Sequence, residues 1–242
     1  YSPLNKGEKG ALRDSQFVLV NARGGATAKG IDIFGSSYTT VTEDEYKFYK
    51  GQVLVSISRS TNTSINIFGE EVTTVTTTTN EHSLYEKDGK KAYLLLRQTT
   101  DSLSTGADIF GNTSITTSHQ ANEYSTFQAQ GPYAIKGTFW GVVNVKEFTQ
   151  VTKGIDIFGS SYETNVAKVT WLYVNGRPFQ KESISVNNSI NLFGEQVTTT
   201  TTTTNEYSWY ENPETNKKSF LLIKQTTDSL STGADIFGNT SI

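Results

Sequence analysis

The stretch Gly30-Ile31-Asp32-Ile33-Phe34-Gly35 recurs along the chain in six copies, and this repetition decides the fold. Each copy reads as a small residue, an apolar residue, Asp or Asn, Ile or Leu, Phe and Gly. The copies occupy residues 30–35, 64–69, 106–111, 154–159, 189–194 and 233–238. The chain is therefore built from similar units of about 40 residues, each marked by one Phe-Gly pair.

A longer period lies above the short one. The first three copies map onto the last three with an offset of about 125 residues, as expected for a tandem duplication. The segment Gln98–Ile115 is repeated without change as Gln225–Ile242. We therefore divide the chain into an N-terminal extension (1–16), a first three-motif repeat (17–131) and a second repeat (132–242) that lacks its last hairpin arm.

The composition predicts strands. Thr, Val, Ile, Tyr and Phe are abundant, and such residues suit a pleated, half-buried surface. Alternation of apolar and polar residues, as in Val53–Ser58, has the period of a strand, and no segment keeps a helical period. Between the Phe-Gly pairs lie further turn signals flanked by aromatic residues: Lys50-Gly51, Asp88-Gly89, Gly131-Pro132, Asn175-Gly176 and Asn212-Pro213.

These patterns predict an all-β chain in the form of an antiparallel meander, rolled into a sandwich or barrel, with strands of about 12–16 residues. The chain would turn alternately at Phe-Gly corners and at Asp-Gly-type corners. Two tandem β-trefoils are the alternative, because each half contains three units of about 40 residues, as a β-trefoil domain does. That fold needs extra turns, which three pairs could supply: Asn80-Glu81, Asn122-Glu123 and Asn205-Glu206.

Composition also excludes several chemistries. The chain has no Cys and only two His, His82 and His119, which argues against zinc fingers, thiol catalysis and a multi-His metal site. A net charge of −3 gives no general footprint for nucleic acid. No apolar run is long enough for a transmembrane helix. Because neither His recurs in the other half and no catalytic motif stands out, we expect no enzyme.

The repeated motif has two interpretations. In the first, it is a corner in which Phe covers the end of the sheet, Gly adopts a backbone angle that other residues resist, and the Asx side chain binds a nearby amide. The second is a row of oxygen ligands for Ca²⁺. The Asx positions are Asp32, Asn66, Asp108, Asp156, Asn191 and Asp235, and the Phe positions are Phe34, Phe68, Phe110, Phe158, Phe193 and Phe237.

Two polar features suggest surface roles. The Thr runs at 72–79 and 197–204 would place a hydroxyl array on a sheet face, which could contact carbohydrate because each hydroxyl donates and accepts. Asn-X-Ser/Thr sequons, possible glycosylation sites on a secretory route, occur at Asn62, Asn112, Asn187 and Asn239.

We therefore expect a secreted, non-enzymatic structural protein that self-assembles by strand addition between subunits, as a fibre, pilus-like filament, matrix or surface layer. The chain begins Tyr1-Ser2-Pro3 and contains no Met, from which we expect N-terminal processing and an extracellular or cell-surface location. Its partner would be another copy of the same chain. Segment 1–16 would pair with its own sheet, in cis, or with the sheet of the next subunit, in trans. A multivalent lectin or adhesin that binds glycans is the alternative, since repeated sites raise avidity.

Overall fold

The computed structural model describes residues 2–3, 17–18, 21–49, 52–87, 89–129, 138–215 and 218–241. Every regular element among them is a β-strand. A two-stranded ribbon, β1 (Ser2–Pro3) with β2 (Phe17–Val18), stands apart from one large sheet. The strands of that sheet are β3 (Asn21–Ile31), β4 (Ser37–Tyr49), β5 (Gln52–Ile65), β6 (Glu71–Lys87), β7 (Lys90–Ala107), β8 (Thr113–Gln128), β9 (Thr138–Ile155), β10 (Ser161–Val174), β11 (Arg177–Ile190), β12 (Gln196–Glu211), β13 (Lys218–Ala234) and β14 (Thr240–Ser241).

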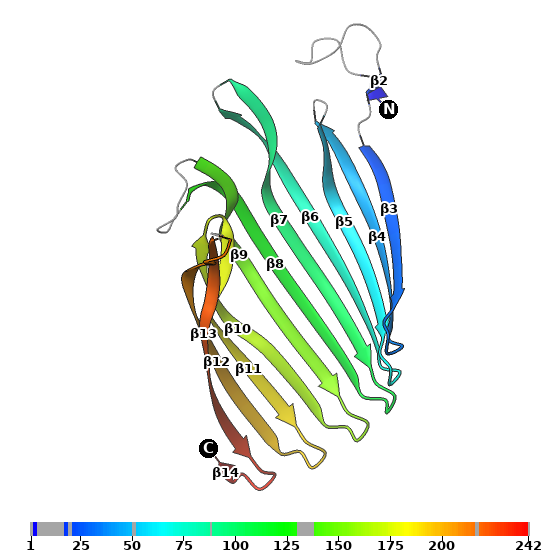
Figure 1. Cartoon of the computed structure of the whole chain (residues 1–242). Helices are drawn as coiled ribbons and strands as arrows, with labels where there is room; N and C mark the ends of the chain where they lie inside the picture. The colour runs from blue at the N-terminus through cyan, green and yellow to red at the C-terminus, as the bar shows by residue number, and fades with distance from the viewer. Residues whose placement is uncertain are drawn as a thin grey trace.

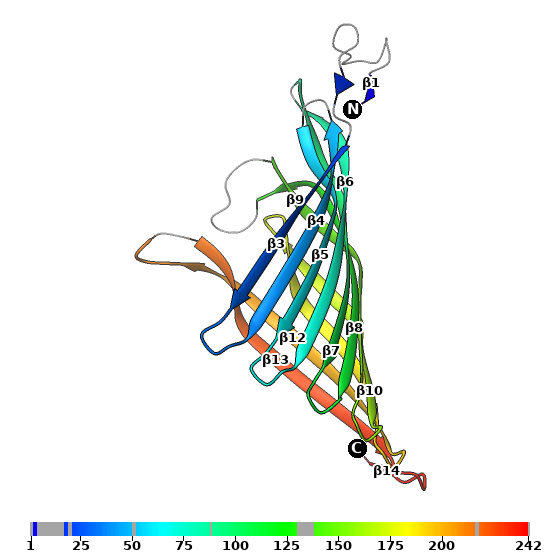
Figure 2. The same ribbon diagram turned by 90° about the vertical axis from the view of Figure 1, so that its right-hand side faces the viewer.

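The large sheet is a 12-stranded antiparallel meander in which every strand pairs with its sequence neighbours. Its strands appear in chain order from blue to red, and the outer strands β3 and β13 remain apart (Figure 1). The view from the side shows a strong twist, which is the usual consequence of right-handed strand twist added over many strands (Figure 2). The predicted meander is confirmed, and so is the expectation of long strands, because β3 to β13 have 11 to 18 residues.

The prediction that the meander rolls into a sandwich or barrel is wrong. The sheet is a single open layer, neither a sandwich nor a barrel. A physical reason lies in the half of the sheet near the Phe-Gly corners, where strands such as β12 carry Thr on both faces. Such strands present no continuous apolar face that a second layer would cover.

The trefoil alternative is also wrong. The three Asn-Glu pairs proposed as extra turns lie inside β6, β8 and β12, which run through them. Each pair instead lies at a β-bulge, where the register shifts between Glu81 and His82, between Ala121 and Asn122, and between Glu206 and Tyr207. The extra residue of each bulge lies on the neighbouring strand, at Leu96, Lys146 and Ile223. The chain therefore continues through the polar pairs, and the bulge opposite them bends the sheet without ending a strand.

The two kinds of turn lie at opposite ends of the sheet. At the end away from the Phe-Gly corners, Asn175 and Gly176 both have positive φ (50° and 72°), as a two-residue hairpin turn requires, which confirms that turn signal. Cross-strand aromatic contacts gather there, including Tyr49–Tyr93 and Tyr85–Trp140 with ring centroids 4.6 and 5.2 Å apart. The signals at Lys50-Gly51 and Gly131-Pro132 lie outside the described residues.

Little of the described chain is buried. The buried apolar side chains are Ala121, Val142, Val145 and Val174, and no large described side chain is fully buried. The last three lie where the β10–β11 hairpin turns back on β9, with the Val142 N–H donating to the Gly176 carbonyl at 2.9 Å. A single-layer sheet has no room for a larger core, so backbone hydrogen bonds and turn geometry carry much of its stability.

Cross-strand pairing gives the two faces different chemistry, because directly paired residues share a face. One continuous row crosses ten strands and contains only Thr, Ser and Asn: Thr40, Asn62, Thr74, Ser104, Thr116, Thr152, Thr164, Asn187, Thr199 and Ser231. We call the face that carries this row the hydroxyl face. Neighbours in the row bind each other, as Thr199 and Ser231 do at 2.8 Å. The opposite, charged face carries ion pairs such as Lys168–Glu182.

The corner glycines offer a test of what holds the sheet. Replacing Gly35 (φ +97°) or Gly111 (φ +92°) by Ala forces an L-residue into a backbone region that it resists, at a cost of about 1–3 kcal/mol. At Gly35 a Cβ would meet nothing within 4 Å, whereas at Gly111 it would lie 3.2 Å from Cγ2 of Ile157. We expect Gly111→Ala to lower the free energy of unfolding more than Gly35→Ala, measured by urea denaturation.

The double variant Gly111→Ala/Ile157→Ala serves as the control, because removing the Ile157 side chain removes the extra contact. The loss of unfolding free energy caused by Gly111→Ala, measured against the single variant Ile157→Ala, should then approach the loss caused by Gly35→Ala. Equal losses at Gly35 and Gly111 in the native background would contradict this account of how neighbouring corners touch.

Candidate functional site

All six Phe-Gly corners lie at one end of the sheet, and each is a hairpin loop with the same hydrogen bonds. In the first corner the Asp32 N–H donates to the Ser36 carbonyl at 2.9 Å, and the Gly35 N–H donates to the Asp32 carbonyl at 3.2 Å. This is the three-residue hairpin loop in which a β-turn is followed by a residue with left-handed backbone, here Gly35. The same pair of bonds recurs in every corner.

The Asx side chain stabilises each loop from within. Oδ1 of Asp32 accepts the N–H groups of Phe34 at 2.8 Å and of Ser36 at 2.9 Å. The other Asx residues accept the corresponding two amides in their own corners: Asn66, Asp108, Asp156, Asn191 and Asp235. Asp and Asn serve equally here, because the oxygen that both side chains carry is the acceptor.

Each corner carries one carboxylate in the pair formed by the Asx residue and the residue four positions later. Where the Asx residue is Asp, its partner is Ser or Asn, as in Asp108 with Asn112, whose Nδ2 donates to Oδ2 at 2.6 Å. Where the Asx residue is Asn, the partner is Glu, as in Asn66 with Glu70 and in Asn191 with Glu195. A row of six carboxylates therefore runs along the corner end of the sheet: Asp32, Glu70, Asp108, Asp156, Glu195 and Asp235.

The spacing of this row bears on calcium. Successive corners are two strands apart, about 10 Å, so their carboxylates are too far apart to surround one ion at 2.3–2.6 Å. In the part of the chain that the structure describes, no three His, Cys, Asp or Glu side chains are grouped so that they could hold a metal ion. Calcium binding at the Asx positions stays a prediction that would need ligands from outside a single corner.

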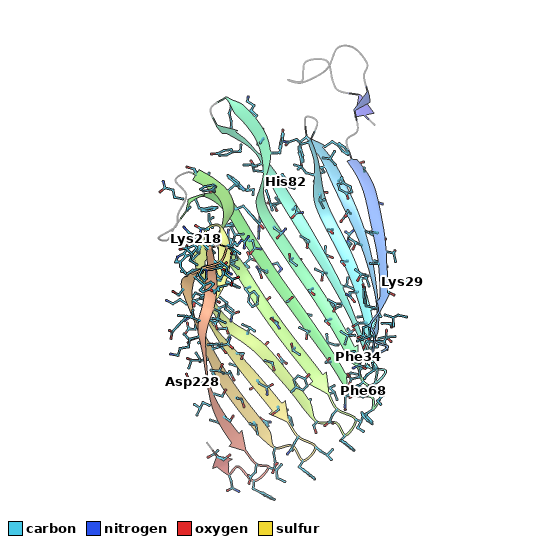
Figure 3. The ribbon with its side chains drawn as sticks, in the orientation of Figure 1. Lys29, Phe34, Phe68, His82, Lys218 and Asp228 are labelled. Carbon is cyan, nitrogen blue, oxygen red and sulfur yellow. The ribbon has the colours of Figure 1, made fainter. Side chains whose placement is uncertain are left out.

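The Phe side chains point away from the sheet. The six corner Phe residues are between 66% and 83% exposed, and Phe34 and Phe68 project from the corner end in Figure 3. The Ile or Leu before each Phe is also exposed, although Ile109 and Ile157 lie over the glycines of the preceding corners, Gly69 and Gly111. In the isolated chain the corner Phe residues thus form an exposed apolar rim.

Two open grooves lie beside the corners. The smaller, of about 250 Å³, lies between the first and second corners and includes Asp32, Tyr38 and Asn66. The larger, of about 580 Å³, extends from the second corner to the fifth and includes Asp108, Asp156 and Tyr162. Both contain Glu70 and Val72, so the grooves follow one another along the corner end of the hydroxyl face.

The sequons fall in two settings. Asn62 and Asn187 lie in mid-strand on the row of hydroxyls, where Asn187 accepts a hydrogen bond from Thr164. Asn112 and Asn239 lie in corners, with their side-chain amides bound to Asp108 and Asp235.

The two histidines lie in different places. His82 is in β6, and burial, followed by the charge of Lys47, lowers its pKa. His119 is on the charged face, where its ring nitrogens contact Asp101 Oδ1 at 2.7 Å and Glu147 Oε2 at 3.2 Å. Its hydrogen bond to Asp101 is the main cause of a raised pKa. The arrangement resembles a structural ion-pair network, because Arg97 also pairs with Glu147.

Comparison with known proteins adds no assignment. No protein-family model, no curated protein and no solved structure matches the chain. Among the residues that the structure describes, no helix has the length and apolar character needed to cross a membrane. Function must therefore be argued from the sheet and its corners alone.

The corner carboxylates should make the fold sensitive to acid. The hydrogen bond from Asn112 is the main cause that lowers the pKa of Asp108, aided by backbone amides and opposed by desolvation. Because the folded-state pKa is lowered, the stabilisation is complete above the ordinary Asp pKa of about 3.9 and is lost as pH falls through the folded value. We expect NMR titration of the Asp108 carboxyl group to show this lowered pKa.

Asp108→Asn is the matched variant, because the native second corner has Asn at this position. Because it removes the carboxylate that accepts from Nδ2 of Asn112, the variant should unfold at a lower urea concentration than the native chain at neutral pH, and this difference should shrink as pH falls through the folded-state pKa. An unchanged acid dependence would mean that Asp108 does not contribute to it.

His119 should act in the opposite direction. Because its folded-state pKa is raised, its stabilisation is complete below the ordinary His pKa of about 6.5 and is lost as pH rises through the folded value. Urea denaturation of the native chain and of His119→Gln at a series of pH values should show that the native advantage declines as pH rises. A constant or growing advantage would contradict the proposed charge pairing with Asp101 and Glu147.

Proposed function

We propose that the chain is a non-enzymatic structural protein that assembles with copies of itself by strand addition outside the cell, at a surface or in a matrix. The observation that carries the proposal is the outer edge of β3, on which no described strand lies. An uncovered strand presents a row of unpaired N–H and C=O groups that readily accept another strand.

The direction of these groups follows from the first corner. Backbone hydrogen bonds alternate along an antiparallel pair, and the Asp32 N–H is bonded toward β4. Counting back along β3, the N–H groups of Gly30, Ala28 and Ala26 point toward β4, and those of Lys29, Thr27 and Gly25 point outward. Lys29 marks this outer strand in Figure 3.

Short side chains on the hydroxyl face of β3 do not obstruct a strand that docks at its edge, and the rings of Tyr38 and Tyr46 lie over Gly30 and Gly24. On the hydroxyl face, the β3 positions paired with β4 are small, namely Gly24, Ala26, Ala28 and Gly30. In the second half, the equivalent strand β9 is covered by β8, which pairs from Thr113 with Ile155 to Gln128 with Thr138. The contact of β8 with β9 is therefore a template for a strand that docks on β3 with the same register.

Lack of a covering layer adds a second argument. Many large apolar side chains of the sheet and its corners remain exposed, among them Ile31 at 78% and Leu230 at 60%. Exposed apolar surface of this extent usually marks an interaction surface. Segment 1–16 is our candidate for the donated strand; apart from Ser2–Pro3, it lies outside the described residues.

Edge addition is tested by Thr27→Pro. Proline removes the outward N–H of Thr27 but is tolerated at an edge where that group faces solvent. We expect the variant to fold like the native chain, judged by circular dichroism, and to fail to form the assemblies that negative-stain electron microscopy and light scattering show for the native chain.

Thr27→Val is the matched control, because it keeps the N–H and should assemble. Deletion of residues 1–16 identifies the donor: loss of assembly supports this segment, and retained assembly points to another strand. A native chain that stays monomeric at millimolar concentration, or a Thr27→Pro variant that assembles normally, would contradict the proposal.

Carbohydrate binding is the second candidate function. It is favoured by a separate observation. The smaller groove contains Tyr38 and the larger groove contains Tyr162, and these two tyrosines occupy equivalent positions in the two halves of the chain.

A further inference from the structure

The two grooves on the hydroxyl face are built from equivalent residues. Seven of the nine residues that line the smaller groove have their repeat equivalents in the larger one. The pairs that matter for binding are Asp32 with Asp156, Ser36 with Ser160, Tyr38 with Tyr162, Ser64 with Ser189, and Asn66 with Asn191. Directly beyond the tyrosines the two halves differ, since Thr39-Thr40-Val41 corresponds to Glu163-Thr164-Asn165.

A tyrosine forms one wall of each groove. Tyr38 pairs across the strands with Gly30, and a Cβ added to Gly30 would lie 2.3 Å from Cε1 of the Tyr38 ring. Tyr162 has the same relation to Gly154, again at 2.3 Å. Each ring therefore lies over a glycine of the neighbouring strand, while 47% of Tyr38 and 41% of Tyr162 remain exposed. The glycine both admits the ring and restricts its movement.

Polar side chains line each groove together with its tyrosine. The corner carboxylate of Asp32 or Asp156 lies on one side, with Oδ1 already engaged by backbone amides and the second oxygen in reach of Ser36 or Ser160. The hydroxyl of Ser64 or Ser189 also lines the groove, as does Asn66 or Asn191, whose side-chain amide is already bound to Glu70 or Glu195. A ligand in the groove would thus meet an aromatic surface together with donors and acceptors.

We propose that these grooves are two equivalent binding sites for neutral pyranose sugars, one at Tyr38 and one at Tyr162. A pyranose ring has an apolar C–H face that can stack on tyrosine and a rim of hydroxyls that can bind carboxylate, hydroxyl and amide groups. The row of corner carboxylates disfavours acidic sugars, because a second negative charge would lie beside them.

The geometry suits a polymer. The two tyrosines lie on β4 and β10, six strands apart, which is at most roughly 29 Å along the sheet. One polysaccharide chain, or two neighbouring chains on a surface, could engage both sites, and linked binding raises avidity without further contacts. This proposal does not depend on edge addition at β3, so either one can fail alone.

The test is isothermal titration calorimetry of the full chain with three neutral hexasaccharides: cellohexaose, mannohexaose and the hexamer of N-acetylglucosamine. Oligogalacturonate serves as the acidic arm. We expect at least one neutral hexasaccharide to bind, either as one molecule in each groove or as one molecule that spans both, and oligogalacturonate to bind more weakly. Tyr38→Ala and Tyr162→Ala should each leave one site, and the double variant should leave none.

Three further variants keep the outcome interpretable. Tyr38→Phe retains the ring and should keep its site, and Tyr210→Ala removes a tyrosine that is 49% exposed but lies outside the grooves. If an alanine variant fails to fold, Ser64→Lys and Ser189→Lys place a long side chain in the groove beside an intact tyrosine and should also block one site each. The proposal is overturned if none of the three neutral hexasaccharides binds, or if the double variant binds as the native chain does.

Discussion

The backbone amide of each corner Asx residue donates to the carbonyl four residues later, and this bond sets the position from which two long strands pair. The Asx side chain and the positive φ of the following Gly restrict the loop to one geometry, so the register of each hairpin is determined at its corner. A slip of one residue would exchange the hydroxyl face and the charged face. The continuous row of like residues from β4 to β13 therefore depends on the four corners inside it and on the turns at the other end of the sheet.

That dependence explains why the sheet can exist with so few buried apolar side chains. Only Ala121 and three Val residues are buried apolar residues in the described chain, and the remaining stabilisation must come largely from the ladder, the loops and contacts within each face. The same arrangement leaves an edge, two faces and an apolar rim accessible. A protein built in this way has extended surfaces for binding and assembly, which is the common basis of both proposals.

Much of this arrangement could be predicted from the sequence. The corner motif contains the Asx and Gly residues that form its turn, and the regular spacing of the motif indicates a meander. Closure could not be predicted, since strands such as Gln196–Glu211 carry Thr on both faces and match an open sheet as well as a rolled one. The trefoil alternative placed a turn at Asn80-Glu81 because polar pairs are common in turns, whereas the pair lies within β6, next to a bulge at Leu96 of β7. Tyr38 and Tyr162 were not predicted as site residues, although the segment Gly-Ile-Asp-Ile-Phe-Gly-Ser-Ser-Tyr ends in these tyrosines in the two halves. Their placement over Gly30 and Gly154 depends on strand register, which the sequence alone does not reveal.

In this structure β3 ends an open, single-layer sheet whose ladder begins at the first corner. Residue-resolved amide hydrogen exchange on dilute chain measures this directly. We expect alternating protection along β3, with slow exchange at Ala26, Ala28 and Gly30 and fast exchange at Gly25, Thr27 and Lys29. Slow exchange at all six amides in a chain shown to be monomeric would mean that β3 is already covered, and would contradict the open sheet.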